Sequence, residues 1–135
     1  MSPTPTLAFT APSQTDLFAE LSQECQRECL DTAQYCQLLG GTFTTPQVLR
    51  LFRECARACR TSLASLAIGS QLTQPLLAAC RALCIESARL CAEFRGTSGK
   101  HKQFETCEEL CRDCAALLDA LVDGRSPHSA AVAAA

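Results

Sequence analysis

Aromatic side chains are scarce in this sequence: they make up 5% of the 135 residues, with no Trp and a single Tyr. So few aromatics leave no platform for stacking nucleic-acid bases. The formal charge is only -2 and no run of Lys and Arg occurs, which argues against nucleic acid or an anionic membrane surface as a partner. The sequence also lacks any apolar stretch of about 18 residues, so no membrane-spanning helix is predicted.

The residues that most enzymes need are also few. The sequence has two His, His101 and His128, and neither stands in a motif that pairs it with a nucleophile. It contains no glycine-rich phosphate loop, no pair of catalytic carboxylates and no serine-elbow motif. Met1 is the single Met, so we do not expect thioether groups to bind a metal ion. We therefore predict that the protein is not an enzyme.

The length and the distribution of breaking residues predict one domain between two tails. A chain of 135 residues with 47% hydrophobic side chains suffices for one core. Residues 1–13 are rich in Pro, Ser and Thr, and residues 124–135 lack periodicity, so flexible tails are expected around a domain at residues 14–123. The N-terminal tail has no positive charge before its apolar residues and no apolar run of signal-peptide length, which predicts a cytoplasmic location.

Four helices are expected within the domain. Its segments are rich in Ala, Leu, Glu, Gln and Arg and lack internal Pro and Gly. We expect Pro46 and Pro75 at first helical positions, and Gly40, Gly96 and Gly124 at C-terminal caps. Helices of similar length joined by short loops predict an all-α fold, an antiparallel up-down four-helix bundle. The breaks between the helices are GGTFTTP at 40–46, GSQLTQP at 69–75 and RGTSGKH at 95–101.

Cysteine is the residue in excess, with 11 in the chain. The first and third helical segments both read CxxxCxxxxxxC, and Cys80 repeats Cys25 at an offset of 55 residues. The second and fourth segments form a looser pair through CxxxC, which indicates a duplicated helical hairpin. The cysteines are Cys25, Cys29 and Cys36, then Cys55 and Cys59, then Cys80, Cys84 and Cys91, and finally Cys107, Cys111 and Cys114.

The spacing places these cysteines on inward faces. At about 100° per residue, offsets of 0, 4 and 11 fall at roughly 0°, 40° and 20°, so each triplet shares one face of its helix. We expect a cysteine-lined core in which the thiols run from mid-bundle to an open end at the 40–46 and 95–101 loops. Thr32, Ser62 and Ser87 share these faces and are expected to donate to helix carbonyls. A hydrophobic base is expected at the other end, from Phe18, Leu21, Leu63, Leu66, Leu76, Leu77, Leu117, Leu118 and Leu121.

A column of thiols predicts binding of a soft metal ion. In a reducing cytosol the thiols stay free, and small cysteines alone would underfill a bundle core. Soft thiolate ligands favour Cu(I), with zinc as a possible substitute. Structural zinc sites are built from closely spaced pairs, and only Cys111 and Cys114 have the CxxC spacing. If each sulfur bridged two ions, the column would hold about one Cu(I) per thiol, roughly 11.

The CxxxCxxxxxxC pattern in two segments and CxxxC in all four resemble the bacterial four-helix-bundle copper storage proteins over about residues 14–123. The resemblance implies Cu(I) bound by all the core thiolates, sequestration of surplus copper, and assembly into a homo-oligomer, a tetramer. Without an export signal the chain resembles the cytosolic branch. Members place His, Met or acidic ligands at the open end, so the resemblance makes His101 a candidate metal ligand. The chain departs from the family pattern at Leu66 and Leu118, which stand where third cysteines are expected.

Two alternatives compete with copper storage. Pairs of CxxxC on adjacent helices also occur in disulfide-stapled helical hairpins of structural or chaperone-like proteins, although the odd cysteine count argues against full pairing. A zinc or copper sensor would instead bind few ions tightly.

Overall fold

The computed structural model describes residues 13–97 and 101–122. Within these residues there is no strand, which confirms the predicted all-α fold, and no helix is both long and apolar enough to cross a membrane. The elements in chain order are α2 (Gln14–Leu39), the 3-10 helix η1 (Gly41–Thr44), α3 (Pro46–Ile68), α4 (Thr73–Thr97) and α5 (Lys102–Val122).

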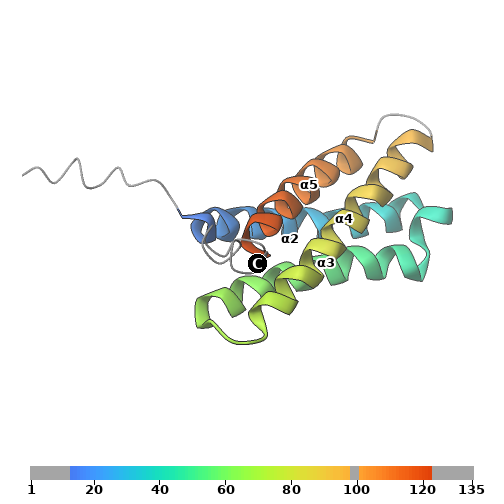
Figure 1. Ribbon diagram of the computed structural model, residues 1–135. Helices are drawn as coiled ribbons and strands as arrows, with labels where there is room; N and C mark the ends of the chain where they lie inside the picture. Colours follow the sequence, from blue (N-terminus) through green and yellow to red (C-terminus); the bar gives the residue numbers. More distant parts are fainter. Residues whose placement is uncertain (1–12, 98–100, 123–135) are drawn as a thin grey trace, which may run out of the picture.

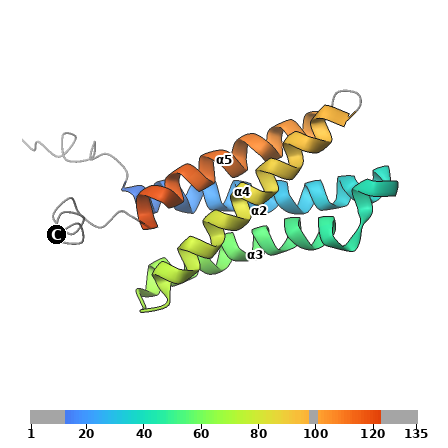
Figure 2. The same cartoon turned by 45° about the vertical axis from the view of Figure 1, so that its right-hand side comes forward.

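The four long helices form a closed ring of neighbours. Helix α2 packs against α3 and α5, and α4 packs against the same two helices from the other side. Figure 1 shows two helical hairpins, α2 with α3 and α4 with α5, and Figure 2 shows the same pairing after rotation. The end of α2, η1, the end of α4 and the start of α5 gather at one end of the bundle, here called the η1 end. The start of α2, the α3–α4 connection and the end of α5 lie at the other end, here called the base.

Local capping chemistry explains where the first hairpin turns. Helix α2 ends at Gly40, whose φ of 73° lies in a region that favours glycine and whose N–H donates to the carbonyl of Cys36 at 3.0 Å. Thr45 then caps α3, because its hydroxyl accepts from the backbone N–H of Val48 at 3.3 Å. Pro46 follows as the first residue of α3. The predicted roles of Gly40 and Pro46 are confirmed.

The predicted ends of the third helix are wrong by a few residues. Helix α4 begins at Thr73, so Pro75 is its third residue and not its first. Proline is tolerated there because the first-turn N–H groups have no partner within the helix. Gly96 lies inside α4, which continues to Thr97, and its φ is not positive. The predicted cap Gly124 and the predicted tails, apart from Ser13, lie outside the described residues.

The base is apolar, as predicted. Phe18, Leu77 and Leu118 are fully buried there. Around them Leu21, Leu63, Leu66, Leu117 and Leu121 are partly buried against the core, whereas Leu76, which was also predicted there, is not among the residues packed against it. Burying the three fully enclosed side chains stabilises the fold by about 2 kcal/mol each. This layer holds one end of the helices together.

Candidate metal centre

All eleven cysteines lie in the core, where each has an exposed fraction of 0% and none forms a disulfide. Helices α2 and α4 contribute three each, α3 contributes two and α5 contributes three. The prediction that every thiol points inward is therefore confirmed. Because the helices are antiparallel, cysteines from both ends of the sequence lie at the same level of the bundle.

The sulfur atoms form a continuous chain of contacts across α2 and α5. The Sγ of Cys111 lies 3.9 Å from that of Cys25, 3.8 Å from that of Cys29 and 4.0 Å from that of Cys107. The sulfurs of Cys25 and Cys29 are themselves 4.0 Å apart. These separations are well beyond a sulfur–sulfur bond of about 2.05 Å. The four thiols are thus neighbours that one or more ions can join.

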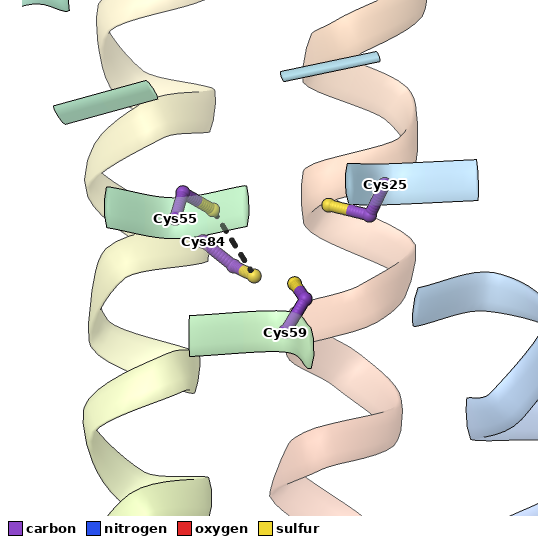
Figure 3. Close-up of side chains that lie close together, drawn as sticks. All are labelled: Cys25, Cys55, Cys59 and Cys84. Atoms are coloured by element: carbon purple, nitrogen blue, oxygen red, sulfur yellow. Dashed lines mark hydrogen bonds between the residues drawn. The ribbon is translucent and has the colours of Figure 1, made fainter. Parts of the chain in front are cut away.

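A second set of contacts joins α3 to α4. The Sγ of Cys55 lies 3.7 Å from that of Cys84, and the Sγ of Cys59 lies 3.7 Å from that of Cys80. Figure 3 shows the sulfurs of Cys25, Cys55, Cys59 and Cys84 directed toward a common space between the helices. Those four sulfurs lie within 4.8 Å of one another, and so do the sulfurs of Cys25, Cys29, Cys55 and Cys111. Because the two groups share Cys25 and Cys55, they form one continuous cluster able to bind metal.

The contacts repeat with the duplication seen in the sequence. Positions in α2 and α4 correspond at an offset of 55 residues, as for Cys25 and Cys80, and positions in α3 and α5 at an offset of 52, as for Cys59 and Cys111. The Cys25–Cys111 contact of 3.9 Å between α2 and α5 corresponds to the Cys80–Cys59 contact of 3.7 Å between α4 and α3. By the same offset Cys114 corresponds to Ser62. The second hairpin, α4 with α5, therefore carries one thiol more than the first hairpin, α2 with α3.

The thiols perturb one another's proton affinity. Burial, with a smaller effect of the Cys107 charge, raises the pKa of Cys36 to about 11. Hydrogen bonds from Cys59 and Cys84 lower the pKa of Cys80 to about 5. Hydrogen bonds with Cys114 and other thiols instead raise the pKa of Cys59 and of Cys84, so neighbouring thiols of the core shift in opposite directions. Among the described residues, no Lys, Arg, His, Asp or Glu is in the buried set, so no side-chain charge balances thiolates in this core.

The η1 end is closed by aromatic rings, where the sequence predicted an open end. Phe104 is fully buried and packs against Tyr35, Phe43 and Phe94, with ring centroids 5.3, 5.8 and 5.2 Å away. The ring of His101 joins the same group, 5.2 Å from Phe104. Each of three aromatic residues lies within one helical turn of a cysteine near this end: Tyr35 precedes Cys36, Phe94 follows Cys91 and Phe104 precedes Cys107. The aromatic cluster therefore separates the thiols from solvent at this end.

His101 is held by a hydrogen bond inside this cluster. Its Nδ1 lies 2.9 Å from the hydroxyl of Tyr35, while its Nε2 is buried without a hydrogen-bond partner among the described residues. His101 is not in either four-sulfur group. If Nδ1 carries the proton and donates to Tyr35, the lone pair of Nε2 is available to a metal ion.

The sequence analysis missed several residues of this site. Tyr35, Phe43 and Phe52 were not predicted to be functional, yet Tyr35 contacts His101 and Phe52 is fully buried. Leu51, four residues before Cys55 on the same face of α3, is only partly buried. The 52-residue offset offered a signal, since it aligns Phe52 with Phe104.

Of the three hydroxyls that were predicted to donate to helix carbonyls, one does so. Ser62 donates to a helix carbonyl as expected, that of Leu76 in α4 at 3.3 Å. The Thr32 hydroxyl instead accepts from Nε2 of Gln103 at 2.9 Å. Ser87 Oγ is buried and has no partner among the described residues, so its prediction is wrong.

A helical bundle whose core is a continuous column of free thiols defines a class of cysteine-rich metal-binding proteins. The family model for copper storage protein matches residues 12–122, which is most of the chain. The protein therefore belongs to the copper storage protein family, as the sequence pattern predicted. No curated protein and no solved structure matches the chain.

Proposed function

We propose that the protein binds multiple Cu(I) ions through its core thiolates and stores them, sequestering cytosolic copper. The observation that carries this proposal is the column of eleven fully buried cysteines with no buried charged side chain among the described residues. A metal-bound thiolate is negative, and an isolated charge in such a core is strongly unfavourable. The bound ions must therefore neutralise the sulfurs themselves.

Charge balance favours Cu(I) over zinc. One Cu(I) per thiolate leaves the column neutral, whereas Zn²⁺ bound by four thiolates leaves a charge of about -2 at each site. Distance alone does not decide, because tetrahedral zinc with bonds of about 2.3 Å places its sulfurs about 3.8 Å apart, close to the separations of 3.7 Å seen here. Zinc is therefore a substitute that the core accepts with an electrostatic penalty.

All eleven cysteines are proposed as ligands, because the sulfur contacts and the mutual pKa effects connect them into one column. Cys36 lies at its outer end, where it interacts with the charge of Cys107. His101 is proposed as a ligand for copper that enters or leaves at the η1 end. Its support is the unpartnered Nε2 and the Tyr35 hydroxyl that fixes the other ring nitrogen.

An anaerobic titration tests this function. Fully reduced protein is titrated with Cu(I) against a competing chromophoric chelator, and free thiols are counted on protein taken directly from cells. We expect saturation at about ten ions per chain, since one ion per thiol balances the charge. The matched control replaces Cys25, Cys29, Cys80 and Cys84 with Ala, and should retain its helix content while losing much of its capacity.

The two rival functions predict other results. Saturation at one or two ions would make the protein a sensor, and thiols already oxidised in cells would make it a disulfide-stapled structural protein. The cysteines are free, which does not favour the disulfide-stapled protein, and a sensor with one or two ions would leave most of the eleven buried thiols without metal.

We also propose that the protein is cytoplasmic and assembles into a homo-oligomer, a tetramer. Ile68 and Leu72, at the α3–α4 connection, support assembly, since they have exposed fractions of 80% and 67%. Light scattering on the purified full chain gives the mass directly; a monomeric mass across the micromolar range would contradict this part of the proposal.

A further inference from the structure

Equivalent grooves lie on the outer faces of the two helical hairpins. The groove between α2 and α3 is lined on the α3 side by Arg53, Ala56, Arg57 and Arg60. The groove between α4 and α5 is lined on the α5 side by Glu105, Glu108, Glu109 and Arg112. At the 52-residue offset these four positions correspond one to one. The duplication therefore gives two faces built on equivalent helices, here called the α2–α3 face and the α4–α5 face.

The side chains at these equivalent positions have opposite charges. Arg53 corresponds to Glu105 and Arg57 corresponds to Glu109, and all four are exposed. The contrast extends along both helices. Helix α3 carries four Arg and one Glu, a net charge of +3, whereas α5 carries five acidic residues, one Lys and one Arg, a net charge of -3. The α2–α3 face is thus basic where the α4–α5 face is acidic.

The arginines of α3 have no acidic partner in the described part of the chain. None of the four forms an ion pair there. On the equivalent helix α5, Arg112 pairs with Glu108 at 3.0 Å, but at the matching positions of α3 Arg60 follows Ala56. The charge of the α2–α3 face is therefore free to interact with another molecule.

The acidic residues of α2 do not neutralise this face, because they lie on the side of α5. Glu28 accepts a hydrogen bond from Gln103 of α5 at 2.8 Å, and Glu24 lines a groove with Leu117 of α5. Outside the described residues the sequence has a single acidic residue, Asp123. One carboxylate cannot balance four arginines, so the complementary charge has to come from another chain.

Each face also carries an exposed apolar side chain. Leu30 has an exposed fraction of 52% and lies in the same groove as Arg53 and Arg57. Ile85, which corresponds to Leu30 at the 55-residue offset, has an exposed fraction of 37%. Protein interfaces combine an apolar centre with a polar rim, and both faces have these components.

We propose that the protein binds a second copy of itself through these surfaces, with the basic α2–α3 face of one copy against the acidic α4–α5 face of the next. When the two grooves face each other with antiparallel helices, α3 lies opposite α5 of the second copy and α2 lies opposite its α4. Arg53 and Arg57 then stand opposite glutamates, and Leu30 stands opposite an isoleucine. Opposite charges thus surround an apolar contact, which favours this pairing over that of two like faces.

The contact is heterologous, because the two faces that meet are different parts of the chain. Each copy therefore binds one neighbour at its basic face and another at its acidic face, and the assembly closes into a symmetric ring if the rotation between copies permits. The inference rests on the homo-oligomer proposed above and names the surface that holds it together. It does not depend on copper.

Charge reversal tests the contact without changing the core. One variant, Arg53→Glu/Arg57→Glu, makes the α2–α3 face acidic. A second variant, Glu105→Arg/Glu109→Arg, makes the α4–α5 face basic. The two variants are studied separately and as an equimolar mixture, in which each reversed face meets a reversed face of opposite charge.

The matched control is Glu20→Arg/Glu24→Arg. It changes the net charge by the same amount as the second variant, at exposed positions of α2 that line the groove toward α5 and lie outside both faces. For each full-length protein we would measure the mass by sedimentation across the micromolar range, the helix content by circular dichroism and the Cu(I) capacity by titration.

Each reversal alone should weaken self-association by at least about tenfold, because ion pairs become like-charge contacts at every interface. The mixture should regain the wild-type mass, and the control should keep it. Association of the wild type should weaken between about 0.1 M and about 1 M salt, since salt screens exposed charges. Helix content and copper capacity should stay as in the wild type in all three variants.

Wild-type mass in either reversal variant would overturn the inference, and so would a mixture that stays dissociated. A dissociated control would overturn it as well, because it would show a general effect of surface charge. A monomeric wild type would refute the inference together with the proposed assembly. An intact oligomer that binds only one or two Cu(I) ions would instead refute the storage function alone, so the failures are distinguishable.

Discussion

Cys25 and Cys55 belong to both four-sulfur groups, and this shared membership predicts an unequal effect of removing equal numbers of thiols. The test compares the double variant Cys25→Ala/Cys55→Ala with the control Cys36→Ala/Cys91→Ala. Each variant removes two of the eleven cysteines. If the shared sulfurs bridge ions, the first variant should lose more copper than the second.

The magnitude follows from the geometry. The two groups contain six different cysteines, which at one ion per thiol hold roughly six Cu(I). Without the shared pair, each group keeps two sulfurs, and two sulfurs hold roughly one two-coordinate ion. Capacity should therefore fall from roughly 11 to roughly 7 in the first variant, against roughly 9 in the control.

The assay is the anaerobic Cu(I) titration, with circular dichroism on the copper-free proteins. Each substitution removes one small buried group and should cost about 1 kcal/mol of unfolding free energy, so both variants should remain helical. Equal capacities in the two variants would refute bridging through the shared sulfurs. A copper-free variant that fails to fold would show that these cysteines are needed for packing.

Three further predictions concern single residues. Burial raises the pKa of Cys36 from 9.0 to about 11, so its contribution to copper-free stability, up to about 3 kcal/mol, is present below pH 9 and lost as the pH rises through 11. Cys36→Ala should flatten unfolding free energies measured across this range. His101→Ala should slow copper loading in stopped-flow mixing without changing capacity, and Tyr35→Phe should slow it less; wild-type rates in both would remove His101 from the site. Leu118→Ala should cost about 2 to 5 kcal/mol in chemical denaturation with full copper capacity, whereas Leu38→Ala at the surface should cost little.

Much of the fold could be read from periodicity. A residue's direction from a helix axis depends only on its position along that helix, so the spacing of Cys25, Cys29 and Cys36 placed them on one buried face. The glycine at position 40 ended its helix as predicted, because φ of 73° favours glycine. Gly96 was predicted to end its helix, but glycine can also adopt helical backbone angles, and α4 continues past it to Thr97.

The sequence by itself thus determined the four helices, the inward cysteines and the apolar base, because each depends on local spacing and on amphipathic pattern. Only the tertiary structure decided which sulfurs meet, such as Cys25 with Cys111 at 3.9 Å, since such contacts depend on the relative heights of helices far apart in the chain. It likewise closed the η1 end with aromatic rings from four separate segments and left Ser87 unpaired. These features arise from close packing between helices, which no local pattern encodes.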